Sequence, residues 1–133
     1  MLKTATIKQR FTWKKGERLK SRKLIERLFR EGQRFSLFPY RIHYLVDPGV
    51  PPLQAGFGAS TRNFKKAVDR NRIKRLSREA YRLQKQALYD HLVENGRSLA
   101  VFFMYTGKEL PDYGTVTEKI GGALQKLLKE TGK

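Results

Sequence analysis

The most informative stretch of this chain is Arg70-Asn71-Arg72-Ile73-Lys74-Arg75-Leu76-Ser77-Arg78-Glu79-Ala80-Tyr81-Arg82, in which six of thirteen residues are Lys or Arg. Its apolar residues keep a helical period that continues past the stretch, through Ile73, Leu76, Ala80, Leu83 and Ala87. At about 100° per residue, the opposite side carries Arg70, Asn71, Lys74, Arg75, Arg78, Arg82 and Lys85, and Arg72 lies at the border of the apolar stripe. The stretch therefore predicts a helix that packs one face on a core and presents dense positive charge on the other.

The balance of charge in this region is unusual for a helix that merely faces solvent. Residues 62–85 contain ten Lys or Arg and two acids, Asp69 and Glu79. Solvated helix faces normally mix both signs, because like charges one turn apart weaken a helix by about 0.2–0.5 kcal/mol per pair. A polyanion would relieve that repulsion, so the segment favours a nucleic-acid surface over a solvated face.

The composition of the whole chain points the same way. Its 133 residues carry a net charge of +17, and a chain of this length fits one domain with a genuine core. Cysteine is absent, which rules out disulfides and cysteine zinc sites and suits a cytoplasmic protein. No apolar run reaches the ~18 residues of a membrane span or forms the centre of a signal peptide. We expect no membrane partner, because the cationic helix lacks the bulky apolar face that inserts into lipid.

We expect residues 1–17 to form a basic, partly mobile arm and residues 18–133 to form a single RNA-binding domain. A first helix is predicted over about residues 21–31, with Ser21 as its N-cap, Gly32 as a left-handed stop, and an apolar face of Leu24, Ile25, Leu28 and Phe29. Strands are predicted over residues 35–38, 40–46 and 53–60, with a turn at 47–52. The small residues Gly56, Gly58 and Ala59 leave room for something to approach the last of these strands.

The second half of the chain predicts two more helices and one more strand. The cationic helix should occupy about residues 67–91, and the apolar run at 98–105 should be a central strand. Thr115 and Glu118 match a capping box, which predicts a last helix that buries Val116, Ile120, Ala123, Leu124 and Leu127. The predicted order is α-β-β-β-α-β-α, an α+β fold built as a two-layer sandwich on one small sheet.

The sequence offers no group of residues typical of a catalytic centre. His43 falls in the middle of a strand and His91 near a helix end, and neither has a partner at a metal-ligand spacing. The carboxylates are few and scattered, so no pair suggests two-metal phosphoryl transfer. We therefore expect no catalytic residue, metal site or organic cofactor in this chain, and predict binding rather than catalysis.

The run from Arg70 to Arg75 resembles the signature of the bacterial ribonuclease P protein component, the small basic subunit of a tRNA-maturing ribonucleoprotein. Arg18-Leu19-Lys20, Leu28-Phe29 and Gly32 resemble the opening helix of that family, and residues 56–60 with Ala67-Val68 resemble its strand-to-helix transition. The resemblance covers about residues 17–130. It departs at the loop Thr61-Arg62-Asn63-Phe64-Lys65-Lys66, where the family often has two lysines and a glycine-containing turn, and at Ile25, where it often has an aromatic residue.

This resemblance implies a ribosomal protein S5 domain 2-like fold with a left-handed βαβ crossover, where the general rule gives a right-handed one. It also implies a function. The protein would bind a catalytic RNA subunit and the 5′ leader of precursor tRNA, and would promote endonucleolytic removal of that leader, leaving a 5′-phosphate. Catalysis and the Mg²⁺ it needs would reside mainly in the RNA, so the protein alone would be inactive. The implied partners are the RNA subunit and precursor tRNA, with no obligate protein partner.

The resemblance implies two binding surfaces, one for the RNA subunit and one for the leader. The RNA subunit would meet the cationic helix at Arg70, Asn71, Arg72, Lys74, Arg75, Arg78 and Arg82, where guanidinium groups suit bidentate phosphate contacts. The leader would lie between the first helix and the sheet, stacked on aromatic rings beside cations. By motif position the candidates there are Ile25, Phe29, His43, Ser60, Thr61, Arg62, Lys65 and Lys66. A core position is an equal alternative for Phe29 and Ile25, and Ser60 could simply end its strand.

Other classes of protein share parts of this pattern. A ribosomal or RNA-chaperone protein would have the same charge and fold, and it remains the alternative function because RNA binding of either kind rests on the same phosphate electrostatics. A helix-turn-helix DNA reader would need a short helix before the recognition helix, but residues 53–66 predict a strand and a loop. The RNA that copurifies with the tagged protein would separate the ribonuclease P function from the ribosomal or RNA-chaperone alternative.

Overall fold

The computed structural model describes residues 17–46 and 51–131. Its elements follow in the order α2 (Arg22–Glu31), β1 (Gln33–Leu37), β2 (Tyr40–Val46), β3 (Leu53–Ala59), α3 (Ala67–Gln84), α4 (Gln86–Glu94), β4 (Leu99–Tyr105) and α5 (Tyr113–Thr131). The α+β class and the order of elements are confirmed, except that the cationic helix is two helices. Of the predicted arm at 1–17 only Glu17 is described, and of the predicted turn at 47–52 only Pro51 and Pro52.

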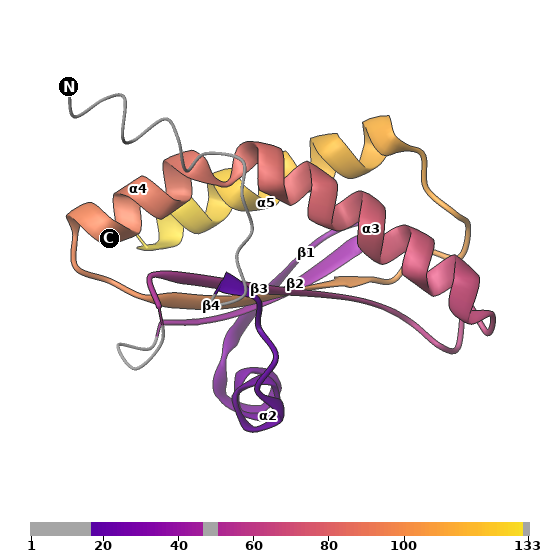
Figure 1. Cartoon of the computed structure of the whole chain (residues 1–133), viewed down its shortest axis with the longest axis horizontal. Coiled ribbons are helices and arrows are strands. Elements are labelled where there is room, and N and C mark those ends of the chain that lie inside the picture. Colours follow the sequence, from indigo (N-terminus) through magenta and orange to yellow (C-terminus); the bar gives the residue numbers. More distant parts are fainter. Residues whose placement is uncertain (1–16, 47–50, 132–133) are drawn as a thin grey trace.

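The four strands form one sheet in the order β1-β2-β4-β3 (Figure 1). β1 and β4 each pair antiparallel with β2, whereas β3 and β4 run parallel. The connection from β3 to β4 therefore crosses over the sheet, and α3 and α4 make up that crossover. The prediction that residues 98–105 form a central strand is confirmed, since β4 lies between β2 and β3.

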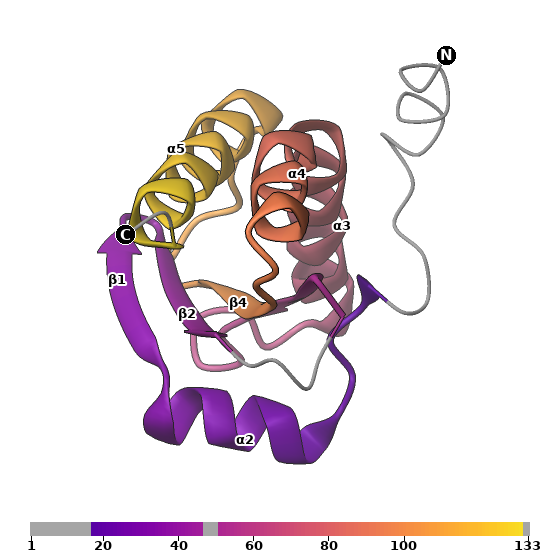
Figure 2. The same cartoon turned by 90° about the vertical axis from the view of Figure 1, so that its left-hand side faces the viewer.

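Helices cover both faces of the sheet (Figure 2). α3, α4 and α5 lie together on one face, and α2 crosses the other. Successive residues of β4 point to alternate faces: Val101 and Phe103 join the larger core under α3 to α5, while Ala100 packs with Leu19 and Leu28 in a smaller core under α2. Coverage on both faces explains why this strand is the most apolar run of the chain.

The two ends of α2 differ in how well the sequence predicts them. Ser21 is confirmed as the N-cap, because its Oγ accepts a hydrogen bond from the Leu24 N–H at 3.2 Å. Gly32 was predicted to be a left-handed stop, and this is wrong: its φ of −74° and ψ of 167° are those of extended backbone. Glycine is needed there for space, since a Cβ would lie 2.5 Å from the carbonyl oxygen of Leu28 and 2.7 Å from that of Tyr44.

The predicted single helix over residues 67–91 is interrupted at Lys85, which joins α3 to α4. Leu83 and Ala87 were predicted to lie on the apolar stripe and are exposed, whereas Lys85 was predicted to lie on the cationic face and is buried. The stripe that is actually buried steps by four or three residues through Ile73, Ser77, Tyr81, Lys85, Leu88 and Leu92. It contains polar residues, so a search for apolar residues alone places the later part of the stripe wrongly.

Two polar members of this buried stripe, Ser77 and Tyr81, have specific contacts with the sheet. Ser77 Oγ donates to the Ile73 carbonyl at 2.9 Å, which leaves the Tyr40 hydroxyl to donate to Ser77 Oγ at 2.5 Å. Burial raises the pKa of Tyr40 to about 12, so its hydroxyl keeps the proton that it donates. The Tyr81 ring packs on Phe57 and Phe103, with centroids 5.4 and 5.9 Å away. These contacts fix the rotation of α3 on the sheet and turn its cationic face outward.

α5 begins two residues before the predicted capping box. Asp112 Oδ1 accepts a hydrogen bond from the Thr115 N–H at 2.7 Å, and this bond lowers the pKa of Asp112. Thr115 is therefore inside the helix, and the capping-box prediction is wrong because a second good N-cap residue stands three positions ahead of it. The five residues predicted to be buried on this helix are all buried.

Candidate nucleic-acid interface

A groove of about 350 Å³ lies between α3, the segment at residues 18–20 and the outer edge of β3. Its cationic lining residues are Arg18, Lys20, Lys74, Arg75 and Arg78, with Asn71 beside them and Ala55, Gly56 and Phe57 on the strand. The described residues that line it include no carboxylate. We call it the cationic groove. Five positive side chains around one hollow suit a run of phosphates.

The structure divides the seven residues predicted to meet the RNA subunit into two groups. Asn71, Lys74, Arg75 and Arg78 line the cationic groove together. Arg70, Arg72 and Arg82 lie outside its lining, with Arg72 exposed. Arg82 forms an ion pair with Glu79 at 2.6 Å. Arg70 donates from Nη1 to the carbonyls of Phe64 and Lys65, at 2.8 and 2.9 Å, so it also holds the loop that precedes α3.

The remaining groove cations, Arg18 and Lys20, were not among the predicted site residues. Arg18 forms a parallel β-bridge with Ala55, and the Leu19 N–H donates to the Ala55 carbonyl at 2.9 Å. Leu19 is buried in the smaller core, and the two cations flank it. Their signal in the sequence is the alternation of Arg18, Leu19 and Lys20, which is typical of a short extended segment with one buried side chain.

An aromatic cluster on the α2 face contains two of the residues predicted to bind the leader. The Phe29 ring stacks on His43 with centroids 4.4 Å apart and planes at 30°, and it meets the edge of Phe102 at 5.4 Å. Phe29 keeps 42% of its surface exposed, which excludes a fully buried core position. Ile25 is half-buried and packs against the smaller core. Neither side chain is fully buried, and leader binding by Phe29 and Ile25 stays a prediction.

The histidine of this cluster is held in its neutral form. Burial lowers the pKa of His43 below its usual value of 6.5, and the nearby cations Arg41 and Arg34 lower it further. A neutral imidazole offers a flat surface for stacking and adds no positive charge at pH 7. Any charge for a bound strand must come from the surrounding arginines and lysines.

The room predicted above β3 is filled by the protein itself. A Cβ on Gly56 would lie 2.9 Å from Phe102 Cδ1, and a Cβ on Gly58 would lie 3.0 Å from Phe102 Cζ. The two glycines therefore make room for the Phe102 ring and not directly for a ligand. The sequence pattern predicts Phe102 only as a strand residue. Its signal is a large aromatic residue on the strand paired with a glycine-rich strand.

The loop between β3 and α3 presents four of the predicted residues to solvent. Ser60 Oγ accepts hydrogen bonds from the N–H groups of Arg62 and Asn63, at 3.2 and 3.3 Å, so Ser60 shapes the loop. Asn63 Nδ2 donates to the carbonyls of Thr106 and Gly107, both at 3.2 Å. Buried Phe64 anchors the loop on the larger core. With these inward anchors, the exposed residues are Thr61, Arg62, Lys65 and Lys66.

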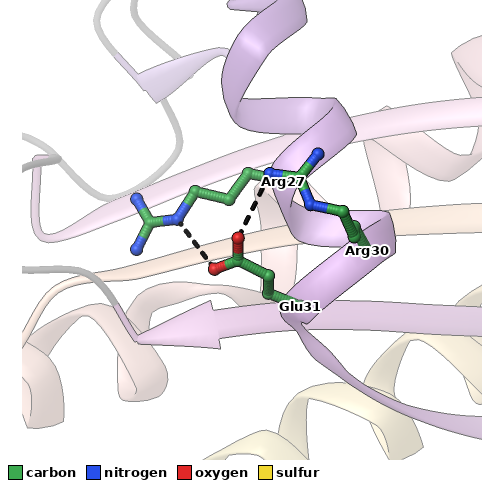
Figure 3. Close-up of polar contacts among 3 residues, drawn as sticks. All are labelled: Arg27, Arg30 and Glu31. Carbon is green, nitrogen blue, oxygen red and sulfur yellow. Dashed lines mark hydrogen bonds and ion pairs between the residues drawn. The ribbon is translucent and has the colours of Figure 1, made fainter.

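Beside the aromatic cluster, the end of α2 carries a group of opposite charges (Figure 3). Glu31 accepts from Arg30 Nη2 at 3.1 Å and from Arg27 Nε at 3.4 Å. These hydrogen bonds, that of Arg30 first, lower the pKa of Glu31. The three side chains together contribute one net positive charge at neutral pH, so this end of α2 is less basic than its two arginines suggest.

Neither a metal centre nor a membrane span is found in the described part of the chain. Among residues 17–46 and 51–131, no three His, Asp or Glu side chains gather where they could hold a metal ion. No helix within the same residues is long and apolar enough to cross a bilayer.

Comparisons with known proteins give the family of this chain. The family model for ribonuclease P matches residues 13–128. The ribonuclease P protein component of Porphyromonas gingivalis is 39% identical over 120 residues, spanning 89% of this chain and 85% of the relative. That of Chlorobium phaeobacteroides is 32% identical over 127 residues and 86% of each chain. The solved RNase P protein of Thermotoga maritima has the same fold, with a TM-score of 0.63 at 23% identity over 83% of this chain and 96% of that one. The chain therefore belongs to the ribonuclease P protein component family.

Proposed function

We propose that this chain binds the catalytic RNA subunit of ribonuclease P through its cationic groove and promotes removal of the 5′ leader from precursor tRNA. The observation that carries the proposal is the convergence of Arg18, Lys20, Lys74, Arg75 and Arg78 on one groove. Each phosphate neutralised by a Lys or Arg releases counterions, and this release drives most of the affinity of such surfaces. The relatives are named ribonuclease P protein components, which supports the RNA subunit of that enzyme as the partner proposed for this groove.

The leader is proposed to bind on the other face of the sheet, at Phe29, His43 and Phe102. Phe29 is stacked on His43 and is 42% exposed, and we propose that a base stacks on the exposed part of the ring. Exposed cations on the loop before α3, among them Arg62, Lys65 and Lys66, can meet the phosphates of the same strand. RNA-subunit binding and leader binding would thus use different faces of one small domain.

Catalysis is assigned to the RNA subunit in this proposal. Mg²⁺ prefers oxygen ligands in octahedral geometry, and the groove is lined by cations and an amide instead of carboxylates. Its donor set does not fit a Mg²⁺ site. We propose that the metal ions are held by the RNA and that the protein alone cleaves nothing.

A reconstitution experiment tests these points. Precursor tRNA is incubated with nuclease-treated protein, with RNA subunit, or with both, at a Mg²⁺ concentration where the RNA alone is slow. We expect intact substrate with the protein alone and rapid release of the leader with both components. Cleavage by the RNA-free protein would overturn the assignment of catalysis. Copurification of the tagged protein with ribosomes in place of a discrete catalytic RNA would favour the ribosomal alternative.

A further inference from the structure

A partly buried ion pair joins the start of the described chain to the junction between α3 and α4. Lys85 Nζ lies 2.6 Å from Glu17 Oε1, and the Lys85 side chain is 4% exposed. Lys85 occupies a core-facing position of the helix stripe, where the residues on either side are Tyr81 and Leu88. The residue directly after Glu17 is Arg18, the first cation of the groove.

Stability alone does not account for this pair. Desolvating two charges is expensive, and well-packed apolar residues at such positions are often as stable or more stable. The pair does, however, fix the position of the backbone at Glu17. Two residues later Leu19 is fixed as well, by burial in the smaller core and by its hydrogen bond to Ala55. Arg18 is therefore held from both sides.

The groove needs such a restraint because it brings like charges together. Arg18 and Lys20 on one wall face Lys74, Arg75 and Arg78 on the other. Like charges repel one another, so a segment that carries two cations needs an attachment to stay beside three more on α3. A β-bridge at a single residue is a weak attachment, whereas the Glu17–Lys85 pair ties the segment to the same helical layer that carries the opposing charges.

We propose that Arg18 and Lys20 contact the RNA subunit and that the Glu17–Lys85 pair is the tether that keeps them at the groove. Glu17 and Lys85 act as positioning residues: the pair itself touches no RNA, and its effect passes through Arg18 and Lys20. The inference rests on the proposed function, since it extends the RNA-subunit surface from α3 to the segment at residues 18–20.

The test measures how affinity for the RNA subunit changes with salt concentration. The slope of log affinity against log salt counts the phosphates engaged, at about 0.7–0.9 per contact. Removing two contacts with Arg18→Ala and Lys20→Ala should reduce the slope by about 1.4–1.8. Combining Glu17→Gln with Lys85→Met removes both charges of the pair while keeping side chains of similar length. It should reduce the slope by a similar amount although Arg18 and Lys20 are still present.

The quadruple variant that combines all four substitutions gives the decisive comparison. If the tether acts through Arg18 and Lys20, its slope should equal that of the Arg18→Ala, Lys20→Ala variant. Lys108→Ala with Lys129→Ala is the matched control, because it removes two exposed lysines that do not line the groove and should leave the slope unchanged. Thermal melting of each variant reports the fold separately.

Two results would overturn the inference. One is a wild-type slope for the Arg18→Ala, Lys20→Ala variant, which would exclude the two cations as contacts. The other is a wild-type slope for a folded Glu17→Gln, Lys85→Met variant, which would leave the pair a purely structural role even if the melting temperature falls. Failure of the wild-type protein to bind the RNA subunit would instead refute the proposed function, and the inference with it.

Discussion

Replacing Phe29 by alanine tests whether the aromatic cluster on the α2 face binds the leader. Phe29 is stacked on His43 and is 42% exposed, so one side of the ring can receive a base. Stacking of a base on an aromatic side chain contributes ~1–3 kcal/mol. We expect Phe29→Ala to weaken binding of leader-bearing precursor tRNA by about tenfold, or ~1.4 kcal/mol. Mature tRNA has no leader, so its affinity should not change.

The same substitution also has a cost in stability, which can be worked from the burial of the ring. Truncating a fully buried Phe to Ala costs about 3–5 kcal/mol. Phe29 is 42% exposed, so we expect a loss of about 2 kcal/mol, including the ring contacts with His43 and Phe102. Phe29→Leu separates the two effects: it keeps most of the apolar contact, and therefore most of the stability, but removes the flat surface for stacking.

The assay is fluorescence anisotropy of the reconstituted holoenzyme with labelled precursor and mature tRNA. Phe38→Ala is the matched control, because Phe38 is an aromatic residue on the turn after β1, is 74% exposed and makes no ring contact with the cluster. It should bind both RNAs like the wild type. Equal losses for precursor and mature tRNA with Phe29→Ala, or wild-type precursor binding by Phe29→Leu, would refute a stacking role for Phe29.

Three further substitutions test other parts of the structure. Reversing Arg75 and Arg78 to Glu should lower the salt slope of RNA-subunit binding by at least about two units, and should leave urea unfolding unchanged because both side chains are exposed. Because the pKa of His43 is lowered in the folded chain, the His43 imidazole takes up a proton more readily in the unfolded chain. The unfolding free energy should therefore fall as pH drops below about 6.5, and His43→Gln should flatten this change between pH 7.5 and 5.5 in denaturant titrations. Asn63→Ala should cost about 1–2 kcal/mol in the same titrations, since it removes two hydrogen bonds to carbonyls.

Each of these predictions has an outcome that contradicts it. Wild-type assembly by the Arg75, Arg78 variant would exclude the groove as the RNA-subunit surface. An unchanged pH dependence in His43→Gln would assign the titration to another group. Wild-type stability of Asn63→Ala would show that Phe64 anchors the loop without help from the amide.

Regular patterns in the sequence predict strand bounds and buried faces correctly where the buried residues are the apolar ones. The strand at 40–46 was predicted at both of its ends, because its side chains alternate between the two cores. The predicted stripe on the cationic helix failed after Ala80, because Tyr81 and Lys85 are buried there through contacts with aromatic rings and Glu17, which are distant in sequence. It also omitted Ser77, which is buried against Tyr40. Propensity and periodicity carry no information about such partners.

The candidate site likewise contains residues that helical spacing predicted and residues that depend on contacts distant in sequence. Helical spacing alone put Asn71, Lys74, Arg75 and Arg78 on one surface, and they share one groove. Arg18 and Lys20 join them because β3 pairs with the segment at residues 18–20, a register that spacing cannot reveal. The position of Phe102 beside Phe29 and His43 also depends on strand register, that of β4 with β2 and β3. The hand of the crossover stays a prediction from the family.

The place of β4 in the sheet has a consequence for synthesis of the protein on the ribosome. β4 lies between β2 and β3, yet it is made after both of them and after α3 and α4. A nascent chain that ends before Leu99 holds the β1–β2 hairpin and β3 as two separate pieces, with no strand to join them. α3 then has no finished sheet to pack on, although all of its arginines have already been translated. A nascent chain that lacks β4 cannot present the assembled groove, so RNA meets it as a unit only after Leu99–Tyr105 has been made.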